Sequence, residues 1–165
     1  MKVESLLEAF GNVPSEFLNA AFYLRNPVEN IFKYESFIKR QPGNFESDLE
    51  FFTTEMWLYD SPPIVGEIYR EFVKYCHQEN LLINNELKID KQLVDLGNIS
   101  VPFLNVMAQK DDLVAPASSI ALNNVTGSKD KSTIEYPSGH VGLILGHRAH
   151  AEVWPKVADW LKERG

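Results

Sequence analysis

Two short stretches indicate the fold of this chain: Asn105-Val106-Met107-Ala108-Gln109-Lys110-Asp111-Asp112-Leu113-Val114 and Tyr136-Pro137-Ser138-Gly139-His140-Val141-Gly142. The first predicts a buried strand that runs into an acidic turn, because apolar residues dominate the part before the aspartates. The second predicts the end of another strand, followed by a histidine between glycines that leave the loop free to take unusual backbone angles. Ligands of parallel α/β sheets collect at the carboxyl ends of the strands, so Asp111 and His140 are expected at one sheet edge.

This acid and this histidine have the chemistry of a general-base pair. A carboxylate bonded to one imidazole nitrogen sets the tautomer and leaves the other nitrogen free to accept a proton. An acid followed by a histidine is the back half of an α/β-hydrolase triad, whose nucleophile precedes both. The 165 residues contain no G-x-S-x-G or G-x-C-x-G motif for that nucleophile. The alternative is a plain turn aspartate and a surface histidine.

Other reactive residues have weaker patterns. Cys76 is the single cysteine and precedes His77, but it lies on the apolar stripe of a predicted helix. Adjacent helical residues point in different directions, so we expect a buried core cysteine. Ser138 lacks a glycine two residues upstream. A zinc site needs three or four ligands, so His147 and His150 alone predict no metal site.

Composition narrows the class of protein. The net charge is -7 without any run of lysines or arginines, which argues against a nucleic-acid partner. A single cysteine suits a reducing cytoplasm. No apolar run approaches the roughly 20 residues that span a bilayer. We therefore expect a cytoplasmic globular protein without a membrane span.

The chain changes character near residue 80. Before it, apolar residues at helical spacing predict four helices. Their stripes are Val3, Leu6, Leu7, Phe10; Val28, Ile31, Phe32; Phe45, Leu49, Phe52, Met56; and Val65, Ile68, Phe72, Cys76. Eight of the ten phenylalanines lie at or before Phe52, which suggests a cap that packs on another surface. For most of these residues we expect the other alternative, an ordinary helical core, because apolar stripes usually pack inside a protein.

After residue 80 the pattern is typical of an α/β fold. A hairpin is predicted around Asp90-Lys91, then a strand at 101–108, a helix from Pro116 and a strand at 132–136. Pro155 predicts the start of a last amphipathic helix. Strand, helix, strand and helix imply parallel pairing, and two strands alone make a marginal sheet. The rest of the sheet is therefore expected outside this chain.

Several stretches resemble those of poly(3-hydroxyalkanoate) synthases, in particular the kind that works with a second subunit. The stretches are Phe10-Gly11-Asn12-Val13-Pro14, Trp57-Leu58-Tyr59-Asp60-Ser61-Pro62, Tyr69-Arg70-Glu71-Phe72, Gln78-Glu79-Asn80-Leu81-Leu82, Val94-Asp95-Leu96-Gly97-Asn98-Ile99, Val101-Pro102-Phe103-Leu104-Asn105, Asp111-Asp112-Leu113-Val114-Ala115-Pro116 with Ser118-Ser119, and Gly139-His140-Val141-Gly142. The resemblance covers nearly the whole chain. It implies a partial α/β-hydrolase fold, with a helical cap region at 1–80 and the C-terminal part of the core at 81–165.

The resemblance also implies a reaction and two site residues. The acyl group of an (R)-3-hydroxyacyl-coenzyme A, a substrate rather than a resident cofactor, would pass to a cysteine with release of coenzyme A. Asp111 matches the catalytic aspartate and His140 the general base, while the nucleophile elbow would lie before residue 1. Asp112 stands where the family commonly has histidine, and Ala115 replaces a usual proline. The extra charge of Asp112 is expected to raise the pKa of one or both carboxyls.

The resulting prediction is part of a polyhydroxyalkanoate synthase that lacks its nucleophile half. Its expected partners are that missing half and a second subunit or another copy of the chain, in the cytoplasm at the polyester granule surface. One alternative is a non-catalytic cap protein that binds synthase or granule. Another is the remnant of an α/β-hydrolase esterase.

Overall fold

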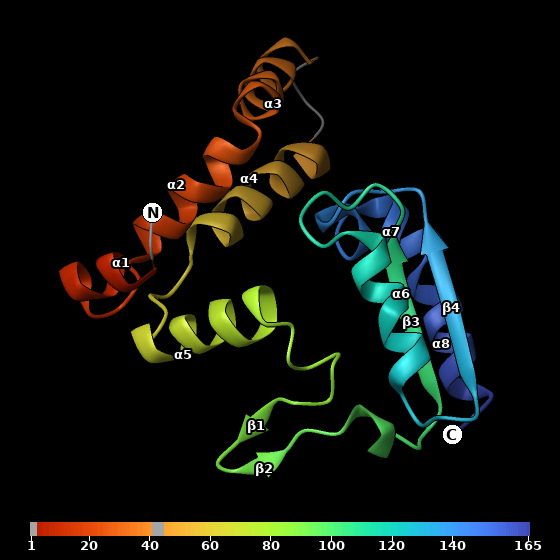
Figure 1. Cartoon of the computed structure of the whole chain (residues 1–165). Coiled ribbons are helices and arrows are strands. Elements are labelled where there is room, and N and C mark those ends of the chain that lie inside the picture. The colour runs from red at the N-terminus through yellow and green to blue at the C-terminus, as the bar shows by residue number, and fades with distance from the viewer. Residues whose placement is uncertain (1–2, 41–44) are drawn as a thin grey trace. The chain divides into compact units, whose positions relative to one another are not determined.

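The computed structural model describes residues 3–40 and 45–165, which fall into two units, Met1–Glu79 and Asn80–Gly165 (Figure 1). The elements of the first unit are α1 (Val3–Phe10), α2 (Ser15–Arg25), α3 (Pro27–Lys39), α4 (Phe45–Tyr59), α5 (Gly66–Glu71) and the π-helix η1 (Phe72–Gln78). Those of the second are β1 (Lys88–Ile89), β2 (Gln92–Leu93), η2 (Leu96–Asn98), β3 (Phe103–Ala108), α6 (Pro116–Val125), β4 (Lys131–Tyr136), η3 (Val141–Leu143), α7 (His147–Glu152) and α8 (Trp154–Lys162). The fold is mixed, with helices and two small sheets.

The first unit is built from helices whose ends follow the sequence signals. Pro27 occupies the first turn of α3, and α4 ends at Tyr59, before the two prolines that cannot continue it. Figure 1 shows α4 returning alongside α2 and α3. Glu55 of α4 holds that pairing, because its carboxylate accepts hydrogen bonds from Lys33 Nζ at 2.7 Å and Tyr34 Oη at 2.5 Å.

A small core joins α1 to the segment before α5. It contains Leu6, Leu7 and Val13, packed against Val3, Phe17, Leu18, Ile64 and Tyr69. Val13 and Ile64 exchange two backbone hydrogen bonds. A Cβ on Gly66 would lie 1.9 Å from the carbonyl oxygen of Gly11, so this close approach requires glycine.

Two expectations for this unit are corrected. The apolar stripes of α3, α4 and α5 remain largely exposed within the unit, with Val28 and Ile31 each at 60%. The predicted helix through Cys76 changes to a π-helix at Phe72, whose longer hydrogen-bonding step shifts the face that each side chain occupies. Cys76 is accordingly half-buried rather than a fully buried core residue.

The second unit begins with the predicted hairpin. Asp90 and Lys91 both have positive φ, 48° and 65°, and join β1 to β2. Positive φ at both central residues gives the turn the twist that antiparallel strands need.

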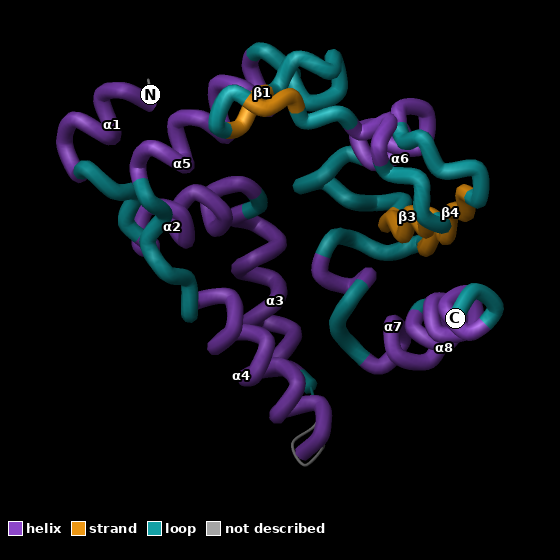
Figure 2. Tube along the Cα trace, turned by 90° about the horizontal axis from the view of Figure 1, so that it is seen from below, coloured by secondary structure: helices purple, strands orange, loops and turns teal. Residues whose placement is uncertain are grey.

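The core of the second unit is the parallel pair β3 and β4, as the sequence predicts. Phe103 lies opposite Lys131 and Ala108 opposite Tyr136, with α6 as the crossover. Figure 2 shows α6 on one face of the pair and α7 and α8 on the other. Within residues 3–40 and 45–165 no third strand joins this sheet, so both strands have a free edge. No helix of the described residues is long and apolar enough to cross a membrane.

Polar side chains hold α6 against both strands. The amide of Asn105, buried in β3, donates to Ser119 O at 2.7 Å and to Asn123 Oδ1 at 2.9 Å. Asn123 in turn donates to Thr133 Oγ1 on β4 at 2.9 Å. A single amide in an otherwise apolar strand thus sets the position of the crossover helix.

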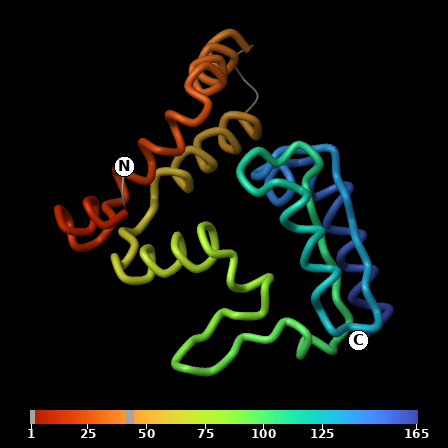
Figure 3. The backbone as a smooth tube through the Cα atoms, viewed as in Figure 1, coloured from red at the N-terminus to blue at the C-terminus, as the bar shows by residue number. Residues whose placement is uncertain are grey.

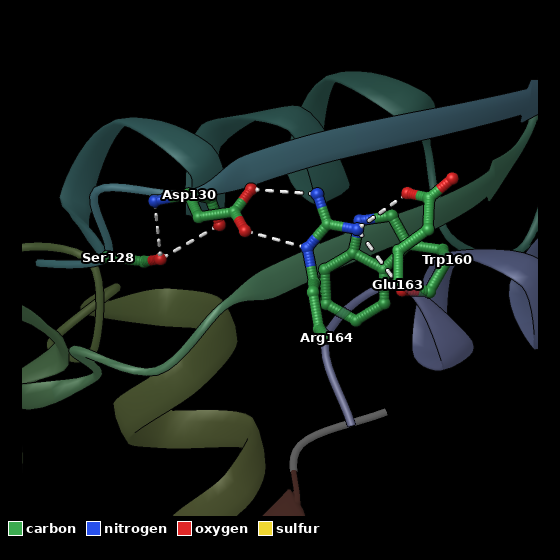
Figure 4. Close-up of polar contacts among 5 residues, drawn as sticks. All are labelled: Ser128, Asp130, Trp160, Glu163 and Arg164. Carbon is green, nitrogen blue, oxygen red and sulfur yellow. Dashed lines mark hydrogen bonds and ion pairs between the residues drawn. The ribbon is translucent and has the colours of Figure 1, made fainter.

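Side-chain contacts bind the C-terminal residues of the chain to the start of β4. In Figure 3 the C-terminus lies beside the turn that enters β4, and Figure 4 shows the contact in detail. Arg164 Nε donates to Asp130 Oδ2 at 2.6 Å and Nη2 to Oδ1 at 3.1 Å. The Arg164 guanidinium also lies 4.3 Å from the ring centre of Trp160. These hydrogen bonds from Arg164 hold the pKa of Asp130 below its usual range.

Candidate acid–base site

The site begins where the backbone pairing continues past the ends of β3 and β4. Gln109 N donates to Tyr136 O at 2.8 Å, and Lys110 N donates to Ser138 O at 3.0 Å. The two loops therefore run side by side for two further residues. This extended pairing brings Asp111, one residue later, to the level of the histidine loop.

The histidine loop turns sharply at Pro137. Ser138 N donates to Tyr136 O at 2.8 Å, which closes a three-residue turn around a proline whose ring restricts φ. The expected unusual angles at Gly139 and Gly142 are absent, because neither has a positive φ. The glycine of this loop with a positive φ is Gly146, at 91°, just before α7.

Asp111 and His140 meet as the sequence predicts. His140 Nδ1 lies 2.8 Å from Asp111 Oδ2, and the Asp111 side chain is 7% exposed against 41% for His140. The other oxygen, Oδ1, accepts the backbone N–H groups of Leu113 at 3.0 Å and Val114 at 2.8 Å. The carboxylate is thus held by its own loop and presents one oxygen to the imidazole.

The environment keeps Asp111 ionised. Burial alone would raise the pKa of Asp111. Hydrogen bonds from Val114 N, from His140 and from Leu113 N together lower it by more, so the net pKa lies below its usual value. The rise expected from the neighbouring charge of Asp112 is therefore not observed at Asp111. An ionised carboxylate can only accept, so His140 Nδ1 carries the proton and Nε2 is the basic nitrogen.

The remaining candidates lie apart from this chemistry. Ser138 Oγ is shut off from solvent and has no hydrogen-bond partner within the described residues, which argues against an attacking hydroxyl. Cys76 lies in η1 of the first unit, where the ring of His77 packs edge-on against Phe72 instead of pairing with a thiol. In the described ranges 3–40 and 45–165 no three His, Cys, Asp or Glu side chains could share a metal ion.

Known proteins resemble this chain over most of its length. The family described as PHB de-polymerase C-terminus matches residues 38–165. A protein of Haloarcula marismortui named Poly(3-hydroxyalkanoate) polymerase subunit PhaC is 40% identical over 98% of this chain and 34% of its own length. Proteins of the same name from Haloferax mediterranei and Synechocystis sp. are 39% and 36% identical over 98% of this chain, and over 33% and 43% of their own lengths. The chain spans less than half of these curated relatives, and the resemblance predicted from its motifs is confirmed.

Proposed function

The chain belongs to the family described as PHB de-polymerase C-terminus, and from this membership we propose that it supplies the general base and orienting acid of a poly(3-hydroxyalkanoate) polymerase. The observation that carries the proposal is the 2.8 Å contact between His140 Nδ1 and Asp111 Oδ2. The similarity to PhaC subunits supports the substrate class, (R)-3-hydroxyacyl-coenzyme A. His140 is the general base, and Asp111 is the acid that orients it.

In the first half-reaction, a cysteine thiol attacks the thioester carbonyl of the substrate. His140 Nε2 takes the thiol proton as the new carbon–sulfur bond forms, and Asp111 stabilises the resulting imidazolium. The bond from the carbonyl carbon to the coenzyme A sulfur then breaks, and the proton passes from His140 to that sulfur. Coenzyme A leaves as the thiol, and the acyl group stays on the cysteine.

In the second half-reaction, the 3-hydroxyl of a hydroxyacyl unit attacks the enzyme-bound thioester. His140 Nε2 accepts the hydroxyl proton and returns it to the departing cysteine sulfur. An ester bond forms and the polyester grows by one unit. The same base serves both halves because each transfers a single proton between the nucleophile and the leaving group.

The attacking cysteine would come from residues other than these 165. The sequence contains no G-x-C-x-G motif, and Cys76 lies on a π-helix without flanking glycines. We assign the second unit to an α/β-hydrolase core because β3, α6 and β4 deliver an acid and then a histidine in the order of that fold. The first unit would be its cap, covering substrate or contacting a second subunit at the granule.

A second candidate is polyester hydrolysis, which the word de-polymerase in the family description favours. The Asp111–His140 pair could activate water instead of a 3-hydroxyl, and the acyl group would then leave as a free hydroxy acid. The two reactions differ in the acyl donor, a polyester ester or a coenzyme A thioester, and in the final acceptor, water or a 3-hydroxyl.

The decisive experiment combines the chain with a polypeptide that carries the G-x-C-x-G elbow and supplies (R)-3-hydroxybutyryl-coenzyme A. Coenzyme A release together with polymer is expected, and His140→Ala should abolish both cysteine acylation and polymer. Free 3-hydroxybutyrate released from added poly(3-hydroxybutyrate), without polymer formation from the thioester, would favour polyester hydrolysis. Polymer formation that survives His140→Ala would refute the proposed base, and granule binding without turnover would favour the non-catalytic alternative.

A further inference from the structure

One side-chain hydrogen bond closes the segment that carries His140, because it joins the two ends of that segment. The segment leaves β4 after Tyr136 and enters α7, which ends at Glu152. The phenol of Tyr136 donates to Glu152 Oε2 at 2.9 Å, and the Tyr136 residue is only 5% exposed. This hydrogen bond joins the last residue of the strand to the last residue of the helix.

Three further contacts support the same closure. Arg148 lies with its guanidinium carbon 5.8 Å from the Tyr136 ring centre, and its Nε is 3.5 Å from Glu152 Oε1. From the start of α8, Trp154 Nε1 donates to Ile144 O of the loop at 3.0 Å. Burial, and then the bond to Glu152, raises the pKa of the Tyr136 phenol, so it remains a proton donor at neutral pH.

The backbone of Tyr136 also contacts the loop that carries Asp111. Its carbonyl oxygen accepts from Gln109 N, two residues before Asp111, and from Ser138 N, two residues before His140. A displacement of Tyr136 would therefore move the two loops that must hold Asp111 and His140 2.8 Å apart. The acid loop has a matching closure, from Asn105 of β3 to Ser119 of α6.

We propose that Tyr136 and Glu152 are positioning residues, whose hydrogen bond holds the His140 loop at the distance where Asp111 fixes the imidazole. The inference rests on the proposed function for its catalytic consequence, but the positioning itself is a property of the folded chain. Tyr136→Phe removes the donor and keeps the ring. Glu152→Ala removes the acceptor, and Glu152→Gln keeps an oxygen acceptor and should restore the closure.

The test measures hydrogen exchange by mass spectrometry on the full chain, for the backbone amides of residues 138–146 and for the Cε1 hydrogen of His140. Asp111→Ala gives the reference rate at which the Cε1 hydrogen of His140 exchanges when no carboxylate contacts the imidazole. Asp130→Asn is the matched control, because it removes the charge of an ion pair that joins the other end of β4 to a helix end. Removing one hydrogen bond should speed loop exchange about fivefold.

Tyr136→Phe and Glu152→Ala are expected to speed loop exchange and move the His140 rate toward that of Asp111→Ala. Glu152→Gln and Asp130→Asn should keep the unsubstituted His140 rate. The inference is overturned if both Tyr136→Phe and Glu152→Ala leave the His140 rate unchanged, or if Asp130→Asn changes it equally. Because no turnover is measured, this result stands apart from the proposed function; in active enzyme the same variants should lower kcat with little change in KM.

Discussion

The substitution Asp111→Asn tests the acid–base site by changing a single atom of the carboxyl group. The side-chain oxygen Oδ1 already accepts two backbone N–H groups, from Leu113 at 3.0 Å and Val114 at 2.8 Å. An asparagine will keep these bonds with its one carbonyl oxygen, because a nitrogen there would meet two donors. The amide nitrogen must then face His140 Nδ1 across 2.8 Å.

That arrangement reverses the tautomer of His140. Two N–H donors cannot face each other at this distance, so Nδ1 becomes the acceptor and the proton moves to Nε2. The basic nitrogen is lost, and turnover is expected to fall about 10⁴-fold, the scale seen when a triad acid becomes an amide. The fold should lose at most about 2 kcal/mol, because one charge-assisted bond to a part-exposed imidazole becomes a neutral one.

The assay follows coenzyme A release by the chain combined with its nucleophile-bearing part, alongside thermal unfolding of the same sample. Asp112→Asn is the matched control, since it removes the neighbouring charge and leaves the carboxylate that contacts His140. We expect Asp112→Asn to be mild. A larger loss for Asp112→Asn, or full turnover by Asp111→Asn, would refute the assignment of the acid.

Four further predictions address activity, association and stability. The 165-residue chain by itself should release no coenzyme A from (R)-3-hydroxybutyryl-coenzyme A, since loss of a nucleophile costs about 10⁶ in turnover; release abolished by Cys76→Ala would show that this thiol attacks. Light scattering after size exclusion should find the chain self-associated, because the first unit exposes apolar stripes and the parallel sheet has free edges within the described residues; a cooperative monomer would contradict this. Arg164 lowers the pKa of Asp130, so the pair stabilises the fold above the unfolded pKa of about 3.9, and this stabilisation is lost as the pH falls through the lower folded pKa. Asp130→Asn should therefore lower the melting temperature at pH 7 and reduce the fall of the melting temperature with acid. Gly127→Ala should lower the melting temperature, because its Cβ would lie 1.9 Å from the carbonyl oxygen of Gly97, whereas Gly139→Ala, with 3.8 Å to Lys110 O, should be tolerated.

Much of the second unit could be predicted from local pattern. The apolar run before Asp111 is β3, Pro116 begins α6, and the segment before Pro137 is β4, paired in parallel as the order of elements implies. Each of these signals depends on the periodicity of burial or on the backbone limits of proline. The meeting of Asp111 with His140 follows from them, because parallel neighbours bring their carboxyl ends to the same edge.

Other features could not be predicted from such signals. The change to a π-helix at Phe72 has no mark in the apolar spacing, and the exposure of Val28 and Ile31 depends on which surfaces are present to cover them. The unusual backbone angle expected at Gly139 is found instead at Gly146, which has a positive φ. Each of these depends on what packs around a residue rather than on its neighbours in sequence.

Residue types and their order were enough to place a carboxylate after one strand and an imidazole after the next. They also show that no cysteine or serine stands on a glycine-flanked elbow in these 165 residues. The folded chain alone gives Asp111 two backbone donors, closes the histidine loop through Tyr136 and Glu152, and fastens Arg164 to Asp130. Periodicity encodes which side of an element is buried, whereas bonds between distant residues depend on distances of a few ångströms that arise only when whole elements pack.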